Sequence, residues 1–183
     1  MEILAESAPP VSIPRIRTAR LLLREFRLSD FDAFASNLMD PLATEFLSPV
    51  TDRRTAYRLF VGGLGYWLLD GTGWWAIELA ATGAFVGSVG AFYRERPCDL
   101  ELGWSVVRSH WRMGIASEAA AAALEFGWTR LGATRAIAHI DGRNIASVGV
   151  SERIGMRFEG DVDFFGEPTR RYAIERRGAI VDA

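Results

Sequence analysis

The stretch that decides the fold runs from Leu100 to Leu131 and reads LELGWSVVRSHWRMGIASEAAAAALEFGWTRL. Residues 100–107 are apolar, β-branched and aromatic, which predicts a strand, and residues 108–114 form a short basic turn. Ser117–Leu131 follows as an alanine-rich segment whose apolar residues recur at helical spacing. A strand, a turn and a helix in this order predict an anion site, because the first N–H groups of a helix lack partners and carry the positive end of its dipole.

The turn itself has features that suit a phosphate. Gly114 lets the backbone approach a ligand closely because it has no side chain, and Ala116 is the next smallest choice. Arg108 and Arg112 add positive charge to the same turn. The plain alternative is a helix start that uses glycine only for its turn, and these residues alone leave both interpretations open.

The run from His110 to Trp128, HWRMGIASEAAAAALEFGW, resembles motif A of the GCN5-related N-acetyltransferases (GNAT), written loosely as Gln/Arg-x-x-Gly-x-Gly/Ala. Gly114 and Ala116 match the last two fixed positions, whereas Trp111 stands where the motif has Gln or Arg. With an aromatic residue at this position, the chain resembles the branch of ribosomal-protein N-terminal alanine acetyltransferases. In such proteins this loop holds the pyrophosphate of acetyl-coenzyme A (acetyl-CoA).

Four further stretches resemble the same branch and follow its order and spacing. They are Thr18–Asp30 (TARLLLREFRLSD), Trp74–Gly87, Leu100–Trp104 (LELGW) and Asn144–Arg157. Together the matches cover about residues 18–175, and five short motifs in the right order are hard to produce by accident. The resemblance implies an α/β (α+β) fold: a mixed, mostly antiparallel twisted sheet with helices on both faces and a splayed central parallel strand pair.

Hydrophobic periodicity along the chain predicts the element order β-α-α-β-β-β-α-β-α-β-β. Strands are expected at 20–27, 74–79, 84–94, 99–106, 135–140, 156–162 and 169–175, and helices at 29–39, 51–69, 117–131 and 144–154. The strand, helix and strand at residues 99–140 predict a parallel, right-handed unit. Glycines within residues 51–69 predict a kinked or frayed helix.

Length and composition set the domain organisation and exclude several classes. The 183 residues fit one domain, expected at residues 18–176, with a loose arm at 1–17 and a tail at 177–183. A net charge of −2 gives no electrostatic case for nucleic acid or membrane partners, and no uncharged run approaches the length of a membrane span. The single Cys98 suits a reducing compartment, so a cytoplasmic protein is expected. The two histidines lie too far apart to suggest a metal site.

The resemblance implies attack of a primary amine on the thioester of acetyl-CoA, which serves as co-substrate. The amine must lose a proton to a base, and the departing thiolate gains one from an acid. Glu101 is the first candidate for the base, directly or through water, since a carboxylate within an apolar strand is costly if left unpaired. A salt-bridged, structural Glu101 is the alternative, and Glu78 could serve instead. Ser147 and Tyr172 are candidates for the acid, with a core-facing aromatic as the alternative for Tyr172.

The resemblance also implies which residues hold acetyl-CoA. The backbone of Val106 and Val107 is expected to pair with the two amides of the pantetheine arm. Asn144 and Ser147 are expected beside that arm, although Asn144 also suits an ordinary helix cap. The pyrophosphate is expected near Arg108, Arg112, Met113, Gly114, Ile115, Ala116 and Ser117.

The acceptor and the competing functions stay open at this point. The N-terminus of a protein and a small amine are both candidate acceptors, in a site walled by residues 51–69 and 163–171. Aromatic residues in those walls could instead complete the core or a contact between two copies of the chain, so a homodimer stays open. A non-catalytic acyl-CoA binding or sensing module is the alternative function. A nucleotide-binding domain is disfavoured, because neither Gly-Lys-Ser/Thr nor Gly-x-Gly-x-x-Gly occurs.

Overall fold

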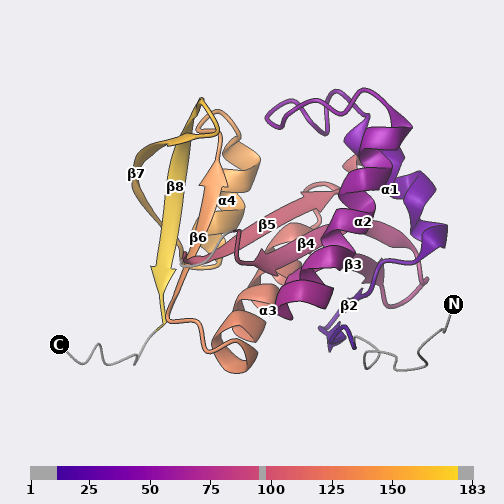
Figure 1. Cartoon of the computed structure of the whole chain (residues 1–183), viewed down its shortest axis with the longest axis horizontal. Helices are drawn as coiled ribbons and strands as arrows, with labels where there is room; N and C mark the ends of the chain where they lie inside the picture. Colours follow the sequence, from indigo (N-terminus) through magenta and orange to yellow (C-terminus); the bar gives the residue numbers. More distant parts are fainter. Residues whose placement is uncertain (1–11, 95–97, 177–183) are drawn as a thin grey trace, which may run out of the picture.

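One mixed sheet organises the part of the chain that the computed structural model describes, residues 12–94 and 98–176 (Figure 1). Its eight strands lie in the order β1-β2-β3-β4-β5-β6-β8-β7. The strands are β1 (Ile16–Arg17), β2 (Leu21–Arg24), β3 (Gly73–Leu79), β4 (Phe85–Phe92), β5 (Leu100–Val106), β6 (Arg135–Ile140), β7 (Arg157–Phe164) and β8 (Glu167–Glu175). The helices are α1 (Phe31–Leu38), α2 (Arg53–Asp70), α3 (Ile115–Arg130) and α4 (Ile145–Arg153), with 3-10 turns at Leu28–Asp30 and Arg108–His110.

The predicted element order and the mixed, mostly antiparallel sheet are confirmed. Every neighbouring pair of strands is antiparallel except β5 and β6, which are parallel and joined through α3. The crossover helix between two parallel strands follows the expected pattern. Within the described residues, none of the helices has both the length and the apolar character that crossing a membrane requires.

Helices cover both faces of the sheet, as predicted (Figure 1). Successive side chains of a strand point to opposite faces, so Trp75 and Ile77 of β3 join the core under α3. Trp74 and Ala76 point the other way and pack with the aromatic residues of α1 and α2. This second, smaller core lies on the face where the candidate site opens.

The start of the described chain differs from the loose arm expected at residues 1–17. Ile16–Arg17 forms the two-residue strand β1, in which Ile16 pairs with Leu23 of β2. The indole Nε1 of Trp75 donates to the carbonyl of Pro14 at 2.7 Å, which ties the preceding backbone to the sheet. Residues 1–11 and the expected tail at 177–183 lie outside the described residues.

Helix α2 is continuous, so the predicted fraying at its glycines is wrong. Asp52 caps its start by accepting a hydrogen bond from the N–H of Thr55 at 2.9 Å. A Cβ atom at Gly63 would lie 3.1 Å from the ring of Phe26 and 3.3 Å from the Cβ of Trp74. The absence of a side chain therefore lets α2 pack closely on β3, and this contact stabilises a helix whose intrinsic propensity is low.

The parallel strands β5 and β6 stay together over only two paired positions. Leu100 pairs with Ala136 and Glu101 with Ile137, and no further pairs follow. The predicted splay of the central strands is thus confirmed, and Glu101 lies where the two strands begin to diverge.

Candidate active site

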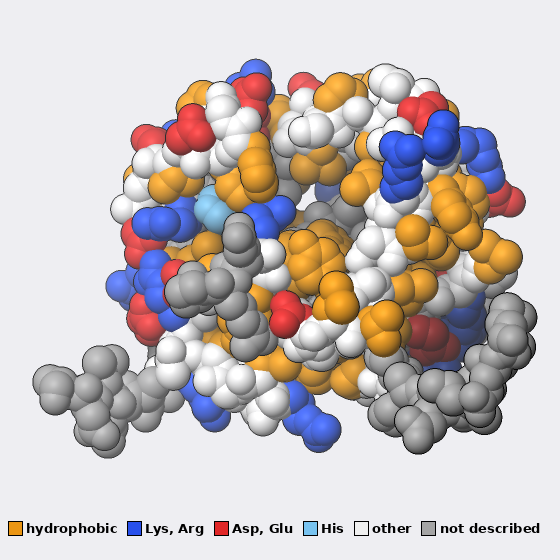
Figure 2. Space-filling model, viewed as in Figure 1, with side chains coloured by type: hydrophobic (Ala, Val, Ile, Leu, Met, Phe, Trp, Pro, Cys, Tyr) orange, Lys and Arg blue, Asp and Glu red, His pale blue; other side chains and the backbone are white. Residues whose placement is uncertain are grey.

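A pocket of about 480 Å³ opens on the α1–α2 face, beside the point where β5 and β6 diverge. Its apolar lining comes from several elements and is mostly aromatic. We call it the aromatic pocket, and its apolar wall consists of Phe26, Phe34, Leu38, Phe46, Leu47, Leu59, Tyr66, Trp74, Phe92, Leu102, Trp104 and Phe164. Figure 2 shows a hollow on this face between the β7–β8 part and the α1–α2 part, with hydrophobic side chains around it.

Strand β5 sends a row of alternating residues toward this pocket. Glu101, Gly103 and Ser105 face it, while Leu100 and Val106 join the core under α3. The intervening Leu102 and Trp104 also contribute to the lining. A Cβ atom at Gly103 would lie 2.6 Å from the ring of Trp74, so glycine makes the room that this indole needs to form part of the wall.

Glu101 lies in the pocket, but its carboxylate is already held. Arg94 donates from Nε to Oε2 at 3.0 Å and from Nη2 to Oε1 at 2.7 Å, and the glutamate is 8% exposed. Burial raises the pKa of the Glu101 carboxyl, but the adjacent His139 ring and Arg94 guanidinium lower it more, so the pKa lies below its ordinary value. The salt-bridged alternative left open by the sequence is therefore the geometry found, and such a carboxylate is a weak proton acceptor. Glu78 instead binds the buried Arg24 at 2.6 Å, outside the pocket lining.

His139 of β6 is a pocket residue that the sequence argument missed. Its Nδ1 is buried and lies 3.6 Å from Oε1 of Glu101, and its ring stacks on Phe164 with centroids 4.2 Å apart and planes at 19°. The sequence did contain a signal: His139 interrupts the apolar run from Ala136 to Ile140, directly after the crossover. What it lacked was the register that brings this ring next to Glu101.

Asn144 and Ser147 both line the pocket from the start of α4. The Oδ1 of Asn144 accepts a hydrogen bond from the N–H of Ser147 at 3.0 Å, so Asn144 caps the helix. Within the described residues the Ser147 hydroxyl makes no hydrogen bond, which leaves it available to a ligand.

Tyr172 lies away from the pocket. It is 3% exposed in the core under α3, opposite Ala138 of β6, and it contacts Phe158 edge to face with centroids 5.8 Å apart. Its position in β8 turns the side chain to the face of the sheet that packs under α3, so the core-facing alternative is the geometry found for Tyr172. Phe164 at the end of β7 lines the pocket, whereas Phe165 in the following turn is 77% exposed.

The glycine turn before α3 has the backbone geometry of an anion site. Gly114 has a φ of +75°, and the first helical hydrogen bond runs from the N–H of Glu118 to the carbonyl of Gly114. Within the described residues, the N–H groups of residues 112–117 donate to no backbone or side-chain acceptor. Unpaired N–H groups at a helix start are the donors that a phosphate binds.

Basic side chains surround this turn. Arg20, directly before β2, donates from Nη1 to the carbonyl of Met113 at 2.8 Å, and Arg153 of α4 lies 3.4 Å from the Ser117 hydroxyl. Arg108 instead binds Asp40 at 2.8 Å, so its charge is already paired. The sequence predicted neither Arg20 nor Arg153 here, because both come from distant segments.

The end of β5 offers one of the two expected backbone partners for a pantetheine arm. Both backbone groups of Val107 are engaged, its N–H by Val86 at 2.9 Å and its carbonyl by His110 at 2.8 Å, so this part of the expectation is wrong. The backbone N–H and C=O groups of successive strand residues point to opposite sides, so those of Val106 point into the gap toward β6. Its carbonyl also accepts the Trp111 indole at 2.7 Å, which fixes the turn to the strand.

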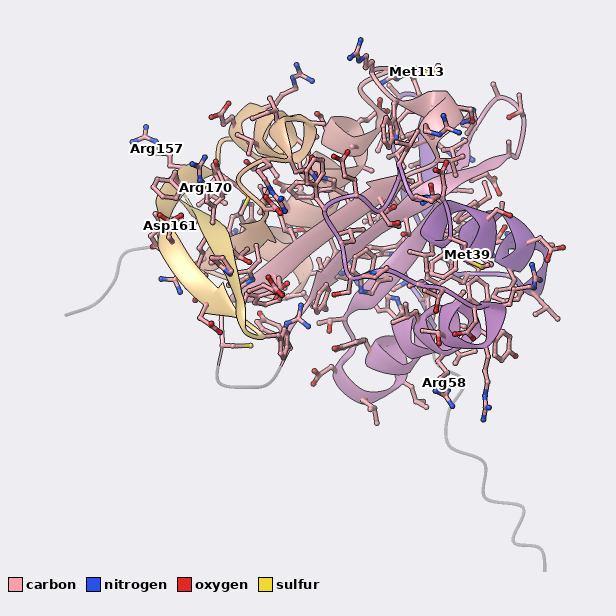
Figure 3. The ribbon with its side chains drawn as sticks, turned by 90° about the horizontal axis from the view of Figure 1, so that it is seen from above. Met39, Arg58, Met113, Arg157, Asp161 and Arg170 are labelled. Atoms are coloured by element: carbon pink, nitrogen blue, oxygen red, sulfur yellow. The ribbon has the colours of Figure 1, made fainter. Side chains whose placement is uncertain are left out.

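The turn and the pocket lie on different sides of the sheet. In Figure 3, viewed from above, Met113 of the turn and Arg58 of the pocket lining are at opposite sides of the molecule, with the strands between them. Among the described residues, no cluster of histidine, cysteine and carboxylate side chains could hold a metal ion.

The acetyltransferase (GNAT) domain family matches residues 20–157 of this chain. The uncharacterized protein YkkB of Bacillus subtilis (strain 168) is 34% identical over 104 residues, which are 56% of this chain and only 60% of that protein. The uncharacterized N-acetyltransferase YnaD of the same organism is 30% identical over 146 residues, 79% of this chain and 84% of that protein.

Solved structures share the fold over nearly the whole chain. The acetyltransferase from Agrobacterium tumefaciens str. C58 has a TM-score of 0.83 at 26% identity and covers 94% of this chain and 100% of its own. At lower identity, ribosomal-protein-S5-alanine acetyltransferase from Vibrio fischeri has a TM-score of 0.73 at 14% identity, covering 90% and 98%. Spermidine N-acetyltransferase from Vibrio cholerae, solved with CoA and spermine, has a TM-score of 0.72 at 17% identity, covering 86% and 96%. The last two similarities are of fold alone.

Proposed function

This chain belongs to the GNAT family of acetyltransferases, and on that premise we propose that it transfers the acetyl group of acetyl-CoA to a primary amine held in the aromatic pocket. The amine nitrogen attacks the thioester carbonyl carbon directly. The observation that carries the proposal is the divergence of β5 and β6 between a turn with unpaired N–H groups and an apolar pocket. A thioester in that gap would present its carbonyl carbon to an amine arriving from the pocket.

Acetyl-CoA fits the groups that this chain offers. Its pyrophosphate would accept from the N–H groups of residues 112–117, with Arg112 and Arg153 supplying positive charge. Its pantetheine arm would accept from the N–H of Val106, whose carbonyl already binds the Trp111 indole, and would lie beside Asn144. Ser147 is proposed as the proton donor to the departing sulfur, because its hydroxyl is free at the pocket wall.

The charges of the pocket favour an amine on an apolar body. Glu101 is paired with Arg94, and Asp141 with Arg143 at 2.6 Å, so neither carboxylate is free to attract a polycation. The remaining wall is mostly aromatic, and burial of apolar surface would supply most of the binding free energy. We therefore propose an acceptor such as an arylalkylamine or a protein N-terminus with apolar residues, and not a polyamine.

The decisive experiment measures release of the CoA thiol with acetyl-CoA as donor and a panel of amines. The panel contains 2-phenylethylamine, spermidine, and peptides that begin with Ala-Phe or Ala-Lys, and mass spectrometry verifies the acetylated product. We expect the highest kcat/KM for 2-phenylethylamine or the Ala-Phe peptide and the lowest for spermidine. Tight binding of acetyl-CoA by calorimetry with no acetylation of any amine would favour the alternative, an acyl-CoA sensing module.

Substituting Leu59 by alanine is expected to weaken binding of the amine selectively. Leu59 of α2 lines the pocket and is 50% exposed, so a bound apolar amine would cover it further. Losing that contact removes about 1 kcal/mol, which corresponds to an increase of roughly fivefold in KM for 2-phenylethylamine. KM for acetyl-CoA should stay unchanged in the same steady-state measurements.

Leu68→Ala is the matched control for this substitution. Leu68 lies on the same helix and is 65% exposed, but it does not line the pocket. The control should leave both KM values unchanged. Equal changes in the two KM values for Leu59→Ala, or the same selective change for Leu68→Ala, would contradict the proposed position of the acceptor.

A further inference from the structure

We propose that His139 is a catalytic residue of this transfer, which takes the proton of the acceptor amine on Nε2 while Glu101 positions its ring. The proposal rests on the proposed function, since it identifies the proton acceptor of that reaction. It is carried by the geometry of three neighbouring side chains, His139, Glu101 and Phe164, at the floor of the aromatic pocket.

The buried edge of the imidazole sets its tautomer. Nδ1 is buried without a hydrogen-bond partner, and Oε1 of Glu101 is an acceptor that lies 3.6 Å away. A buried polar atom without a partner is costly, so a proton on Nδ1 directed at the carboxylate is the favourable arrangement. In a neutral imidazole this leaves the lone pair on Nε2. The distance exceeds a hydrogen bond, and such contacts often tighten when substrate binds.

Packing fixes the plane of the ring. Phe164 stacks on His139 with centroids 4.2 Å apart, and the guanidinium of Arg94 lies over the Phe164 ring, 4.9 Å from its centroid. The His139 ring lines the pocket and its Nδ1 edge is enclosed, so Nε2 is the nitrogen that an amine in the pocket reaches.

Glu101 is poorly suited to take the proton itself. Arg94 occupies both of its oxygens, and the pKa of its carboxyl lies below the ordinary value. A general base works best when its pKa is close to the working pH, which an arginine-bound carboxylate is not. The same carboxylate is well placed to orient a neighbouring imidazole and to stabilise it once it is protonated.

The charged groups on the strands and connections beside His139 have partners of opposite sign in the described structure. Glu101 of β5 and Arg94 of the β4–β5 connection are paired, and Arg171, the cross-strand neighbour in β8, binds Glu159 at 2.6 Å. Asp141, just after β6, binds Arg143, and Arg58 and Tyr66 of α2 are the remaining titratable groups in the lining. The ring therefore faces paired charges, which suits a base that starts neutral and becomes charged during the reaction.

The acceptor ammonium gives one proton to Nε2 of His139, and the freed nitrogen lone pair forms the bond to the acetyl carbonyl carbon. The second proton leaves this nitrogen as the C–S bond breaks, and it ends on the CoA sulfur, with Ser147 as the proposed route. His139 returns its proton to solvent, so the products are the N-acetyl amine, the CoA thiol and one proton.

The first test reads the tautomer in the absence of any turnover. Two-dimensional ¹H–¹⁵N spectra of the labelled protein at neutral pH distinguish protonated from bare ring nitrogens. The chain has two histidines, so the signals that disappear in His139→Gln belong to His139. We expect Nδ1 to carry the proton and Nε2 to be bare, with a tautomer mixture in Glu101→Gln. A protonated Nε2, with Nδ1 either bare or protonated, would overturn the proposal.

The second test is chemical rescue, with the amine of the panel that turns over fastest. His139→Ala should lower kcat by about 10²–10⁴-fold, with acetyl-CoA affinity unchanged by calorimetry. Added imidazole should restore part of the rate, and substituted imidazoles should follow their basicity. Turnover close to that of the natural chain, or a loss that no imidazole restores, would overturn the proposal. If His139→Ala no longer binds acetyl-CoA, His139→Gln takes its place for the rate measurement, because it keeps an N–H but no base.

The two tests separate this inference from the proposed function. If no amine of the panel is acetylated, the proposed function fails while the tautomer still reports on His139. If amines are acetylated but His139→Ala keeps its rate, only the assignment of the base fails.

Discussion

Replacing Gly114 with aspartate is expected to weaken acetyl-CoA binding by about 100-fold or more. Charge-assisted hydrogen bonds contribute about 1.5–3 kcal/mol each, so losing two of them at the pyrophosphate corresponds to this factor. The new carboxylate would lie beside the unpaired N–H groups of residues 112–117 and repel the phosphates. It would also attract Arg20, whose Nη2 is 3.4 Å from the position of a Cβ atom at Gly114. Calorimetry with acetyl-CoA measures the loss.

Gly132→Asp is the matched control, because Gly132 follows the other end of α3. Its φ is +67°, close to the +75° of Gly114, and a Cβ atom there meets nothing within 4 Å. Both substitutions carry a similar backbone cost, so only the position of the charge differs. Acetyl-pantetheine, which lacks the pyrophosphate, should be used equally well by Gly114→Asp and by the natural chain. Unchanged acetyl-CoA affinity in Gly114→Asp would remove the pyrophosphate from this turn.

The fold and this turn could be predicted because their signals are local in the sequence. The apolar strand from Leu100, the glycine turn and the alanine-rich helix are contiguous, and each has its own periodicity. The parallel pair then follows from the handedness of crossover connections. The family resemblance added the splay of β5 and β6, which no periodicity contains.

The chemistry of the pocket could not be predicted, because it depends on register between distant segments. Arg94 and Glu101 are close in sequence, but their bidentate contact forms only when β4 and β5 pair so that Phe92 lies opposite Glu101. His139 reaches Glu101 only through the short parallel pairing with β6. A single residue of slip would turn either side chain to the other face.

Hydrogen bonds that are already made explain the remaining differences at the proposed acetyl-CoA site. Val107 looked like its neighbour Val106 in the sequence, yet its N–H and carbonyl already serve β4 and the following turn. Arg20 is far from the turn in sequence and reaches it because β2 runs past the start of α3, where Glu118 also binds its guanidinium at 2.7 Å. Neither fact has a local signature.

Glu101→Gln is expected to lower kcat by about 10²–10⁴-fold while leaving acetyl-CoA affinity nearly unchanged. Removing a carboxylate that orients a catalytic histidine costs up to about 10⁴-fold, because the imidazole adopts the wrong tautomer. A glutamine amide also cannot stabilise the imidazolium that forms when His139 takes the proton. The turn proposed to bind the pyrophosphate lies on the other side of the sheet, so calorimetry with acetyl-CoA should detect little change.

Glu25→Gln supplies a control with the same contact geometry outside the pocket. Arg15 holds Glu25 from Nε at 2.9 Å and from Nη2 at 2.7 Å, much as Arg94 holds Glu101, and Glu25 does not line the pocket. Steady-state kinetics of both variants with the fastest amine therefore separate the loss of an arginine-bound carboxylate in general from the loss of this one. If kcat is unchanged in Glu101→Gln, or falls equally in both variants, Glu101 serves the fold and not the reaction. A fall in kcat for Glu101→Gln alone places this carboxylate next to the proton transfer. The Arg15–Glu25 ion pair has the same contact geometry but lies outside the pocket, so neutralising it should not change kcat.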